Sequence, residues 1–433
     1  MYNERQVETR INHNCKECTE GGFIVNSKKK FDVKKWTSLL VLCCGTGIIF
    51  QLPYIRNTFY IPLVEALNLS NEEFGALSTS YATISMICYF FGGWIADRVS
   101  PRKLLTISFI STGLVGLLFS TFPSYGTMRL IFAAFGVTTV LTYWSALIKA
   151  VRCLGDSNEQ GRLFGILEGG RGVVSAVAVF VLLALFNSLG GGKFGLSWVI
   201  RSYALLAIIV GIALWFLIKD KKEDVVSGTS LVQQIKSVLL LPKMWLICLI
   251  IFTAYSIYAI LSFLPPYMVS VYGMSKNFSV QIGGIRYIIQ FAGGITGGFL
   301  ADKIGSRIKT VLLGYTAIIA FLIVFLLTPQ QPSLAMLCVF DFILLNVTVY
   351  AVRGIYFAVI DEAQIDRSVT GAVSGMASCI GYLPDVFLYT MIGRWIDQGV
   401  QGYRSMFLYG IGTCVVGAVV AVILIKSIKK TKN

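Results

Sequence analysis

The sequence predicts an all-α membrane protein with twelve transmembrane helices in two pseudo-symmetric six-helix bundles, and composition, apolar runs and an internal repeat support this. Hydrophobic residues make up 55% of the chain and charged residues 14%, and the mean hydropathy is +0.73, which lies outside the range of soluble globular proteins. Apolar runs of about 20 residues, enough to cross a membrane, recur along the chain. Because lipid offers no hydrogen-bond partners, continuous apolar runs indicate helices.

The apolar runs divide into two sets of six, separated by a polar segment. The first six lie near residues 36–65, 76–96, 103–122, 127–151, 163–188 and 196–219. The second six lie near 244–271, 279–301, 308–328, 334–360, 369–393 and 403–426. We therefore expect an N-terminal tail (1–35), an N-terminal bundle (36–219), a central loop (220–243), a C-terminal bundle (244–426) and a short C-terminal tail (427–433).

The net charge of +15 does not indicate nucleic-acid binding, because the basic residues occupy short loops rather than one face. This is the positive-inside pattern of membrane proteins. Basic clusters before the first run (Lys28–Lys35) and after the last (Lys426–Lys432) predict that both termini, and the central loop, are cytoplasmic. The first 35 residues contain no apolar signal-peptide core. The abundance of lysine and the lack of a eukaryotic-style targeting segment favour a bacterial inner membrane.

An internal repeat relates the two sets of runs. The segment Gly92–Arg98 (GGWIADR) is repeated as Gly297–Lys303 (GGFLADK), so that Gly93 corresponds to Gly298, 205 residues further on. Two other features recur at nearly the same spacing. Pro62 near the end of the first run corresponds to Pro265 near the end of the seventh, and the Gly-x-x-x-Gly segment at 161–165 corresponds to that at 371–375. The repeat predicts two related halves.

The segment Gly93-x-x-Ala-Asp-Arg-x-Ser-x-Arg-Lys103 resembles the loop between helices two and three of the major facilitator superfamily, and the copy at 298–307 is similar but reduced. The resemblance covers about residues 36–426. It implies two halves that rock around a substrate site between them, with helices 1, 4, 7 and 10 lining the cavity most directly. It also implies that the motif residues gate transport; the alternative is that their charges only orient the protein in the membrane. These residues are Gly93, Asp97, Arg98, Arg102, Lys103, Asp302 and Arg307.

Arg56 lies within the first predicted span, where an ionisable side chain normally faces a cavity or a partner. Pro53 and Pro62 should bend the helix around it. The stretch from Arg56 to Leu63 is similar to the first helix of organophosphate:phosphate antiporters, which implies a substrate-binding arginine. That branch has a second arginine in helix seven, but residues 255–258 supply none. The alternative is that Arg56 extends to the outer surface.

Arg286 lies within the eighth predicted span. Anion-transporting members of the superfamily outside the phosphate branch use a basic residue in helix eight, so the resemblance implies an anion site here. The alternative is that Arg286 pairs with Asp341 or Asp385, which lie in the tenth and eleventh spans. Either acid could instead carry a proton.

Further residues could contribute to the site or to coupling. Glu168 and Arg171 are three residues apart, which favours a neutral pair on one helix face, although Glu168 could titrate during transport. Glycines 161, 165 and 169 would allow close helix packing at a moving interface. Lys149 and Arg353, near the inner ends of their spans, could face the pocket or extend to the cytosol. The aromatic residues Tyr143, Trp144, Tyr255 and Tyr258 could line the pocket or pack between helices.

The predicted spans contain more basic than acidic side chains. Four arginines counted against three acids leave one excess positive charge, or two if Lys149 is included; the residues are Arg56, Arg171, Arg286 and Arg353, and Glu168, Asp341 and Asp385. An anionic substrate would balance this excess, since guanidinium groups match carboxylate and phosphate bidentately. The sequence therefore predicts a secondary active transporter of a small organic anion, such as a carboxylate, an acidic sugar or a phosphorylated sugar. Transport would be antiport with another anion or symport with protons.

The expected partners are the substrate, a proton or counter-anion, and the bilayer, and we expect a monomer. The sequence contains no P-loop lysine motif, so we do not expect ATP to drive transport. The spans contain no recognisable catalytic or metal-ligand cluster, so we expect no enzymatic activity, cofactor or metal. Cys15-x-x-Cys18 near His13 is a weak metal or redox motif. The alternatives are a transporter or efflux pump of a neutral or cationic solute, with the arginines paired internally, and a transporter-like sensor.

Overall fold

A computed structural model describes residues 33–155, 159–218, 239, 241–363, 365 and 370–432 of the chain, whose regular elements are all helices. Most of the predicted N-terminal tail and central loop lie outside these residues. The motif at Cys15 and Cys18, and the side chain of Asp97, also lie outside the described part.

The first half contains six helical spans, several of them divided. They are α2 (Val33–Ile49) with α3 (Arg56–Leu67), α4 (Asn71–Arg98), α5 (Pro101–Phe119), α6 (Tyr125–Gly136) with the π-helical η1 (Val137–Leu141) and α7 (Trp144–Arg152), α8 (Gln160–Ser188) and α9 (Gly192–Leu217).

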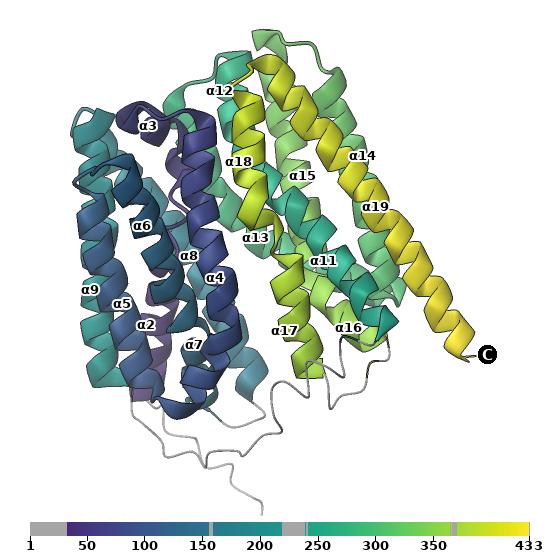
Figure 1. Cartoon of the computed structure of the whole chain (residues 1–433), viewed down its shortest axis with the longest axis horizontal. Coiled ribbons are helices and arrows are strands. Elements are labelled where there is room, and N and C mark those ends of the chain that lie inside the picture. The colour runs from purple at the N-terminus through teal and green to yellow at the C-terminus, as the bar shows by residue number, and fades with distance from the viewer. Residues whose placement is uncertain are drawn as a thin grey trace, which may run out of the picture.

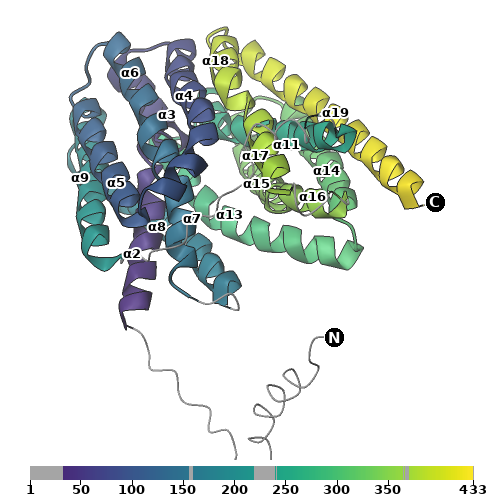
Figure 2. The same ribbon diagram turned by 60° about the horizontal axis from the view of Figure 1, so that its bottom comes forward.

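The second half repeats this order. Its spans are α11 (Pro242–Ile260) with η3 (Leu261–Phe263) and α12 (Leu264–Tyr272), α13 (Lys276–Ile304), α14 (Arg307–Leu327), η4 (Pro332–Leu334) with α15 (Ala335–Ile355), η5 (Tyr356–Ala358) and α16 (Val359–Glu362), α17 (Thr370–Gly381) with α18 (Pro384–Ile396), and α19 (Val400–Lys432). Figures 1 and 2 show the halves as two adjacent bundles, so the predicted fold class is confirmed.

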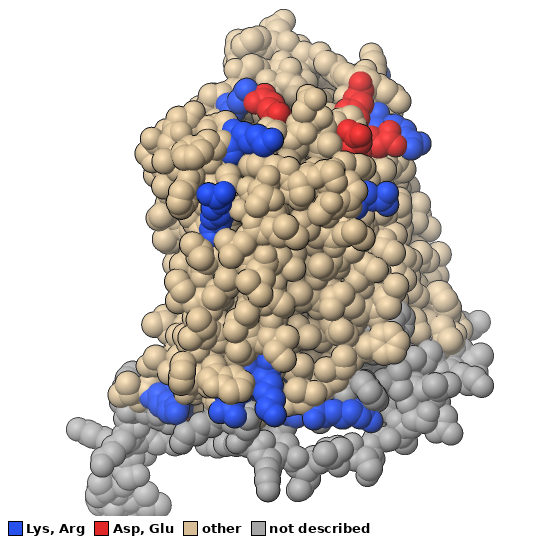
Figure 3. All heavy atoms as spheres, turned by 60° about the vertical axis from the view of Figure 1, so that its left-hand side comes forward, with Lys and Arg blue, Asp and Glu red and all other residues tan. Residues whose placement is uncertain are grey.

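Nine of the described helical segments are long and apolar enough to cross a membrane. The other three spans are the interrupted α2–α3 pair and the more polar α4 and α13. The surface in Figure 3 fits a membrane protein, because a broad, largely uncharged band separates the basic end beside the undescribed residues from an end that carries both charges.

The first predicted span is not continuous. The helix ends at Ile49, and α3 begins only at Arg56, because Pro53 in the intervening turns has no backbone N–H and its ring clashes with the preceding helical turn. The other interruptions, at η1, η3, η5 and 382–383, fall in spans four, seven, ten and eleven. Irregular backbone at membrane depth is tolerated where protein or a water-filled cavity surrounds it. Four of the five divided spans are those that the resemblance places around the cavity.

Glycines allow the halves to approach closely along two helix pairs, α4 with α18 and α8 with α13. A Cβ atom at Gly75 would collide with the backbone oxygen of Tyr389, and one at Gly393 with that of Asn71. On the other pair, a Cβ at Gly284 of α13 would lie 3.0 Å from a side-chain carbon of Val179 on α8. Gly169 of the predicted glycine series faces Phe291 of α13, whereas Gly165 has open space around it.

We expect Gly75→Val to keep α4 and α18 apart, because the added side chain meets backbone atoms that cannot rotate away. The measurement is the cross-linking yield, with a short bifunctional thiol reagent, between cysteines placed at Thr79 and Thr390 in a variant without the native cysteines. The two threonine hydroxyl oxygens are 2.8 Å apart, so the yield should be high in the parent and several-fold lower with Gly75→Val. Gly375→Val is the control, since a Cβ there meets nothing within 4 Å. An undiminished yield with Gly75→Val would contradict the described packing.

Candidate functional site

Arg56 lies in a box of aromatic rings contributed by both halves. Its side chain is only 2% exposed, so it does not extend to the outer surface. The guanidinium carbon lies 4.1–5.4 Å from the centroids of four rings, those of Tyr60, Phe74, Phe263 and Tyr389. Nη1 donates a hydrogen bond to Ser78 Oγ at 2.8 Å, whereas Nε and Nη2 are buried without a described partner. Ring faces and one hydroxyl stabilise this cation where a carboxylate would be expected.

Arg286 and Arg353 flank the ring of Tyr258, on α11, from two different helices. Their guanidinium carbons lie 4.9 Å and 3.8 Å from the ring centroid. Arg286 is 4% exposed; its Nε donates to Tyr350 Oη at 2.9 Å and its Nη2 to the Tyr258 carbonyl oxygen at 3.2 Å. Its Nη1 is buried without a described partner. Two cations on one ring create a site of strong positive potential between the helices.

Neither arginine is neutralised by an acid in the part of the chain that the structure describes. The ion pairs closer than 4.0 Å there involve neither arginine, nor Asp341 or Asp385. The predicted alternative of a pair between Arg286 and one of these acids is therefore wrong. Arg353 packs on Tyr258 and is half-buried, so it does not extend to the cytosol.

Asp385 is a buried acid that is hydrogen-bonded to tyrosines from both halves. Its Oδ2 accepts hydrogen bonds from Tyr255 Oη at 2.8 Å and from Tyr54 Oη at 3.4 Å. Its Oδ1 is buried without a described partner. Asp341 is equally buried and its Oδ2 is also unpartnered.

The predicted pair between Glu168 and Arg171 is present, with Arg171 Nη2 2.7 Å from Glu168 Oε2. The Glu168 side chain is 50% exposed. Arg171 is thus neutralised on its own helix, unlike Arg56, Arg286 and Arg353, for which no ion pair is found among the described residues.

Three residues from the fourth span make their described contacts within the N-terminal half. Tyr143 is completely buried in the core of the N-terminal half, where its hydroxyl donates to Thr46 Oγ1 at 2.7 Å, and Trp144 packs against the same core. In this structure both rings take part in helix packing, and the expectation that they line the pocket stays a prediction. Lys149 Nζ donates to the carbonyl oxygen of Ala96 at 3.3 Å, so this lysine lies beside the end of α4, where the first copy of the repeated motif lies.

The two copies of the motif form the same local structure. Ser100 and Ser306 each cap the following helix by accepting a hydrogen bond from the backbone N–H three residues later, that of Lys103 or Lys309. Ser/Thr side chains at this position satisfy otherwise unpaired helix N–H groups. In the first copy, the guanidinium of Arg102 lies 4.7 Å from the Trp215 ring centroid on α9. The second copy adds a left-handed residue, Gly305, with φ +70°.

Glu362, at the end of α16, completes the second motif and was missed by sequence reasoning. Its carboxylate accepts hydrogen bonds from Ser306 Oγ and the Arg307 N–H, each at 2.5 Å, and from the Ile308 N–H at 3.1 Å. A carboxylate at a helix N-terminus is favourable for both charge and hydrogen bonding. The only sequence signal was an acidic residue ending the tenth span.

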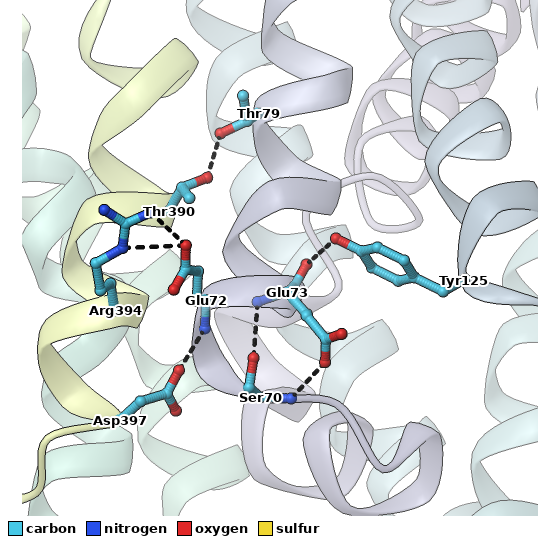
Figure 4. A network of polar contacts seen from close by, with 8 residues as sticks. All are labelled: Ser70, Glu72, Glu73, Thr79, Tyr125, Thr390, Arg394 and Asp397. Atoms are coloured by element: carbon cyan, nitrogen blue, oxygen red, sulfur yellow. Dashed lines mark hydrogen bonds and ion pairs between the residues drawn. The ribbon is translucent and has the colours of Figure 1, made fainter.

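The other end of the molecule has a polar latch between the halves, shown in Figure 4. Asp397 at the end of α18 accepts hydrogen bonds from the backbone N–H groups of Asn71 and Glu72, each at 2.9 Å. Arg394 Nη2 pairs with Glu72 Oε1 at 2.5 Å. Lys276 and Glu65 form a second pair between the halves at 2.7 Å. Sequence reasoning missed this latch, since each member looks like an ordinary loop charge.

The comparisons with known proteins agree with this architecture. The sequence profile of the Major Facilitator Superfamily matches residues 36–387. The chain is 36% identical over 421 residues to inner membrane protein YihN of Escherichia coli (strain K12), covering 92% of this chain and 97% of that protein. It is also similar to the hexuronate transporter of Bacillus subtilis (strain 168) at 22% identity, covering 88% and 93%, and to the cis,cis-muconate transport protein of Acinetobacter baylyi at 25%, covering 84% and 87%.

Two solved structures share the fold. One is a bacterial homolog of the human lysosomal transporter Spinster, inward-facing and unoccupied, with a TM-score of 0.67 and 17% identity over 91% of this chain and 96% of that one. The other is the nucleoside transporter NupG, also with a TM-score of 0.67, at 16% identity over 91% and 98%.

We expect Asp397→Ala to weaken the latch more than Arg394→Gln. Asp397→Ala removes the acceptor for two N–H groups of α4. Loss of a helix cap costs about 1 kcal/mol, which lowers the ratio of latched to unlatched molecules roughly five-fold. Arg394→Gln breaks a solvent-exposed pair, which water screens. The measurement is the distance distribution between spin labels at Thr121 and Gln331, in loops of the two halves at this end. A larger long-distance fraction with Arg394→Gln than with Asp397→Ala would contradict the assignment.

Proposed function

Because this chain belongs to the Major Facilitator Superfamily, we propose that it is a secondary active transporter that moves a small organic anion across the membrane by alternating access. The proposal rests mainly on one observation: Arg286 is buried with a free Nη1 beside a second guanidinium, that of Arg353, and neither has a described acidic partner. Burying such charge is costly unless an anion compensates it during part of the cycle.

The anion is proposed to carry a carboxylate, as hexuronates and muconate do, and an acidic sugar fits the site's polar surroundings best. Tyr258 and Tyr350 form one wall with Arg286, and the Tyr255 ring lies 5.3 Å from that of Tyr258. Tyrosine rings stack on the apolar face of a sugar, and their hydroxyls can bond to its hydroxyls. A neutral or cationic substrate is less well supported, since it would require internal pairing of Arg56 and Arg286.

Arg56 is proposed to be a second anion contact, reached when the aromatic box opens. The rings that enclose it come from both halves, so a rocking motion would change their distance from the guanidinium. Its two unpartnered nitrogens, Nε and Nη2, could then bind a carboxylate or phosphate bidentately.

The proposed orientation has both termini in the cytoplasm of a bacterial cell and the latch on the outer side. The basic end in Figure 3 supports this under the positive-inside rule. The motif residues are proposed to gate the inner side, with Lys149 beside Ala96 at the first copy and Glu362 bound to the second. We propose a monomer without enzymatic activity.

Proteoliposomes should exchange external labelled anion for internal unlabelled anion when tested with a panel of hexuronates, muconate, simple carboxylates and sugar phosphates. Arg286→Gln should reduce exchange of the best anion roughly 10- to 100-fold, because a charge-assisted hydrogen bond contributes about 1.5–3 kcal/mol. Arg353→Gln and Arg56→Gln should also reduce it.

The control is Arg201→Gln, since this arginine of α9 contacts Ser120 and Trp198 outside the site. Exchange that survives both Arg56→Gln and Arg286→Gln unchanged would refute the site assignment. Exchange of a neutral or cationic solute alone would refute the proposed substrate class.

A further inference from the structure

A buried acid lies at the contact between the two halves and is bonded to each of them. Asp385 is 5% exposed and belongs to the first turn of α18, directly after the interruption at 382–383. Tyr255 of the C-terminal half and Tyr54 of the N-terminal half both donate to Oδ2, while Oδ1 has no described partner. An ionised carboxylate with an unpartnered oxygen at membrane depth is costly, and a bound proton removes this cost.

The groups that face Asp385 are tyrosines and arginines. The tyrosines come from the turns at 50–55 and from α4, α11 and α18; they are Tyr54, Tyr81, Tyr89, Tyr255, Tyr258 and Tyr389. Arg353 of α15 lies 5.7 Å from the ring centroid of Tyr255, the residue that donates to the carboxyl, and Arg56 of α3 lies 4.1 Å from that of Tyr389, one turn along α18. Burial therefore disfavours the ionised form of the Asp385 carboxyl, whereas Arg353 and Arg56 stabilise it. The proposed substrate needs the same two arginines.

We infer that Asp385 binds the proton that this protein moves together with its anion; the inference rests on the proposed function. When ionised, Asp385 competes with the substrate for the positive field of Arg353 and Arg56. When a proton is bound, this competition ends and the anion is the only negative charge at the site. Anion and proton therefore favour each other's binding, and this coupling is reciprocal.

The proton balance is simple. A proton from water on one side forms an O–H bond on Asp385, the halves change access, and that O–H bond breaks to return the proton to water on the other side. One proton accompanies one anion. Tyr54 donates to Asp385 across the contact between the halves, so the charge of the carboxyl also affects how firmly the halves hold together.

The experiment compares accumulation with exchange in proteoliposomes, with the carboxylate that the wild type exchanges best. In the wild type, a pH gradient that is acidic outside should drive uptake to at least several-fold above equilibrium. Asp385→Asn should abolish this accumulation yet retain exchange within about three-fold, because the amide resembles the protonated acid. Its apparent affinity for the anion should be independent of pH between about 5 and 8, whereas that of the wild type should tighten as the pH falls.

Three further variants keep the result interpretable. Asp341→Asn removes the other described buried acid and should leave accumulation intact. Asp385→Glu retains a carboxyl and should preserve pH-driven accumulation, which guards against an Asn variant that merely misfolds. Tyr54→Phe removes one donor to the ionised form, so the pH dependence of affinity should move to higher pH.

The outcomes separate the two proposals. If the wild type exchanges no anion, the proposed function fails and this inference fails with it. If the wild type exchanges anions but a pH gradient drives no accumulation, or if Asp385→Asn accumulates as well as the wild type, only the inference is overturned. Loss of accumulation with Asp341→Asn, together with its retention in Asp385→Asn, would assign the proton to Asp341.

Discussion

Guanidinium groups inside the protein that have no carboxylate partner among the described residues are the constraint around which this structure is organised. Arg56, Arg286 and Arg353 are held by aromatic faces, hydroxyls and one backbone carbonyl oxygen. These groups orient a guanidinium without cancelling its charge. The site therefore keeps a positive potential that water cannot screen, and the surrounding spans must bring several tyrosines to one depth to maintain it.

The interruptions of the helices serve this arrangement. Arg56 begins α3 directly after the turns at 50–55, and Asp385 follows the interruption between α17 and α18. At such breaks, a side chain leaves the helix surface in a direction that a continuous helix would not allow. The continuous helices α4, α8, α13 and the short α18 instead supply the glycine contacts between the halves.

The fold was predictable because lipid imposes a strong pattern: apolar runs, charged loops and a duplicated motif are all visible in one sequence. The pair between Glu168 and Arg171 was predictable for the same reason, since both residues share one helix face. Contacts between distant helices were not. The ring partners of Arg56, the core position of Tyr143 and the bonds of Glu362 depend on which residues meet across helices, and local sequence contains no signal for that.

The capping of α4 by Asp397 has a consequence for water. The N–H groups of Asn71 and Glu72 have their acceptor on the opposite half, whereas the capping box of Ser70 and Glu73 lies within the same half and travels with the helix. Whenever the halves separate at this end, the first two N–H groups must exchange a carboxylate for solvent. Under the proposed alternating access, hydration of a helix terminus would be part of each cycle, and conditions that lower water activity should favour the closed end whatever the substrate.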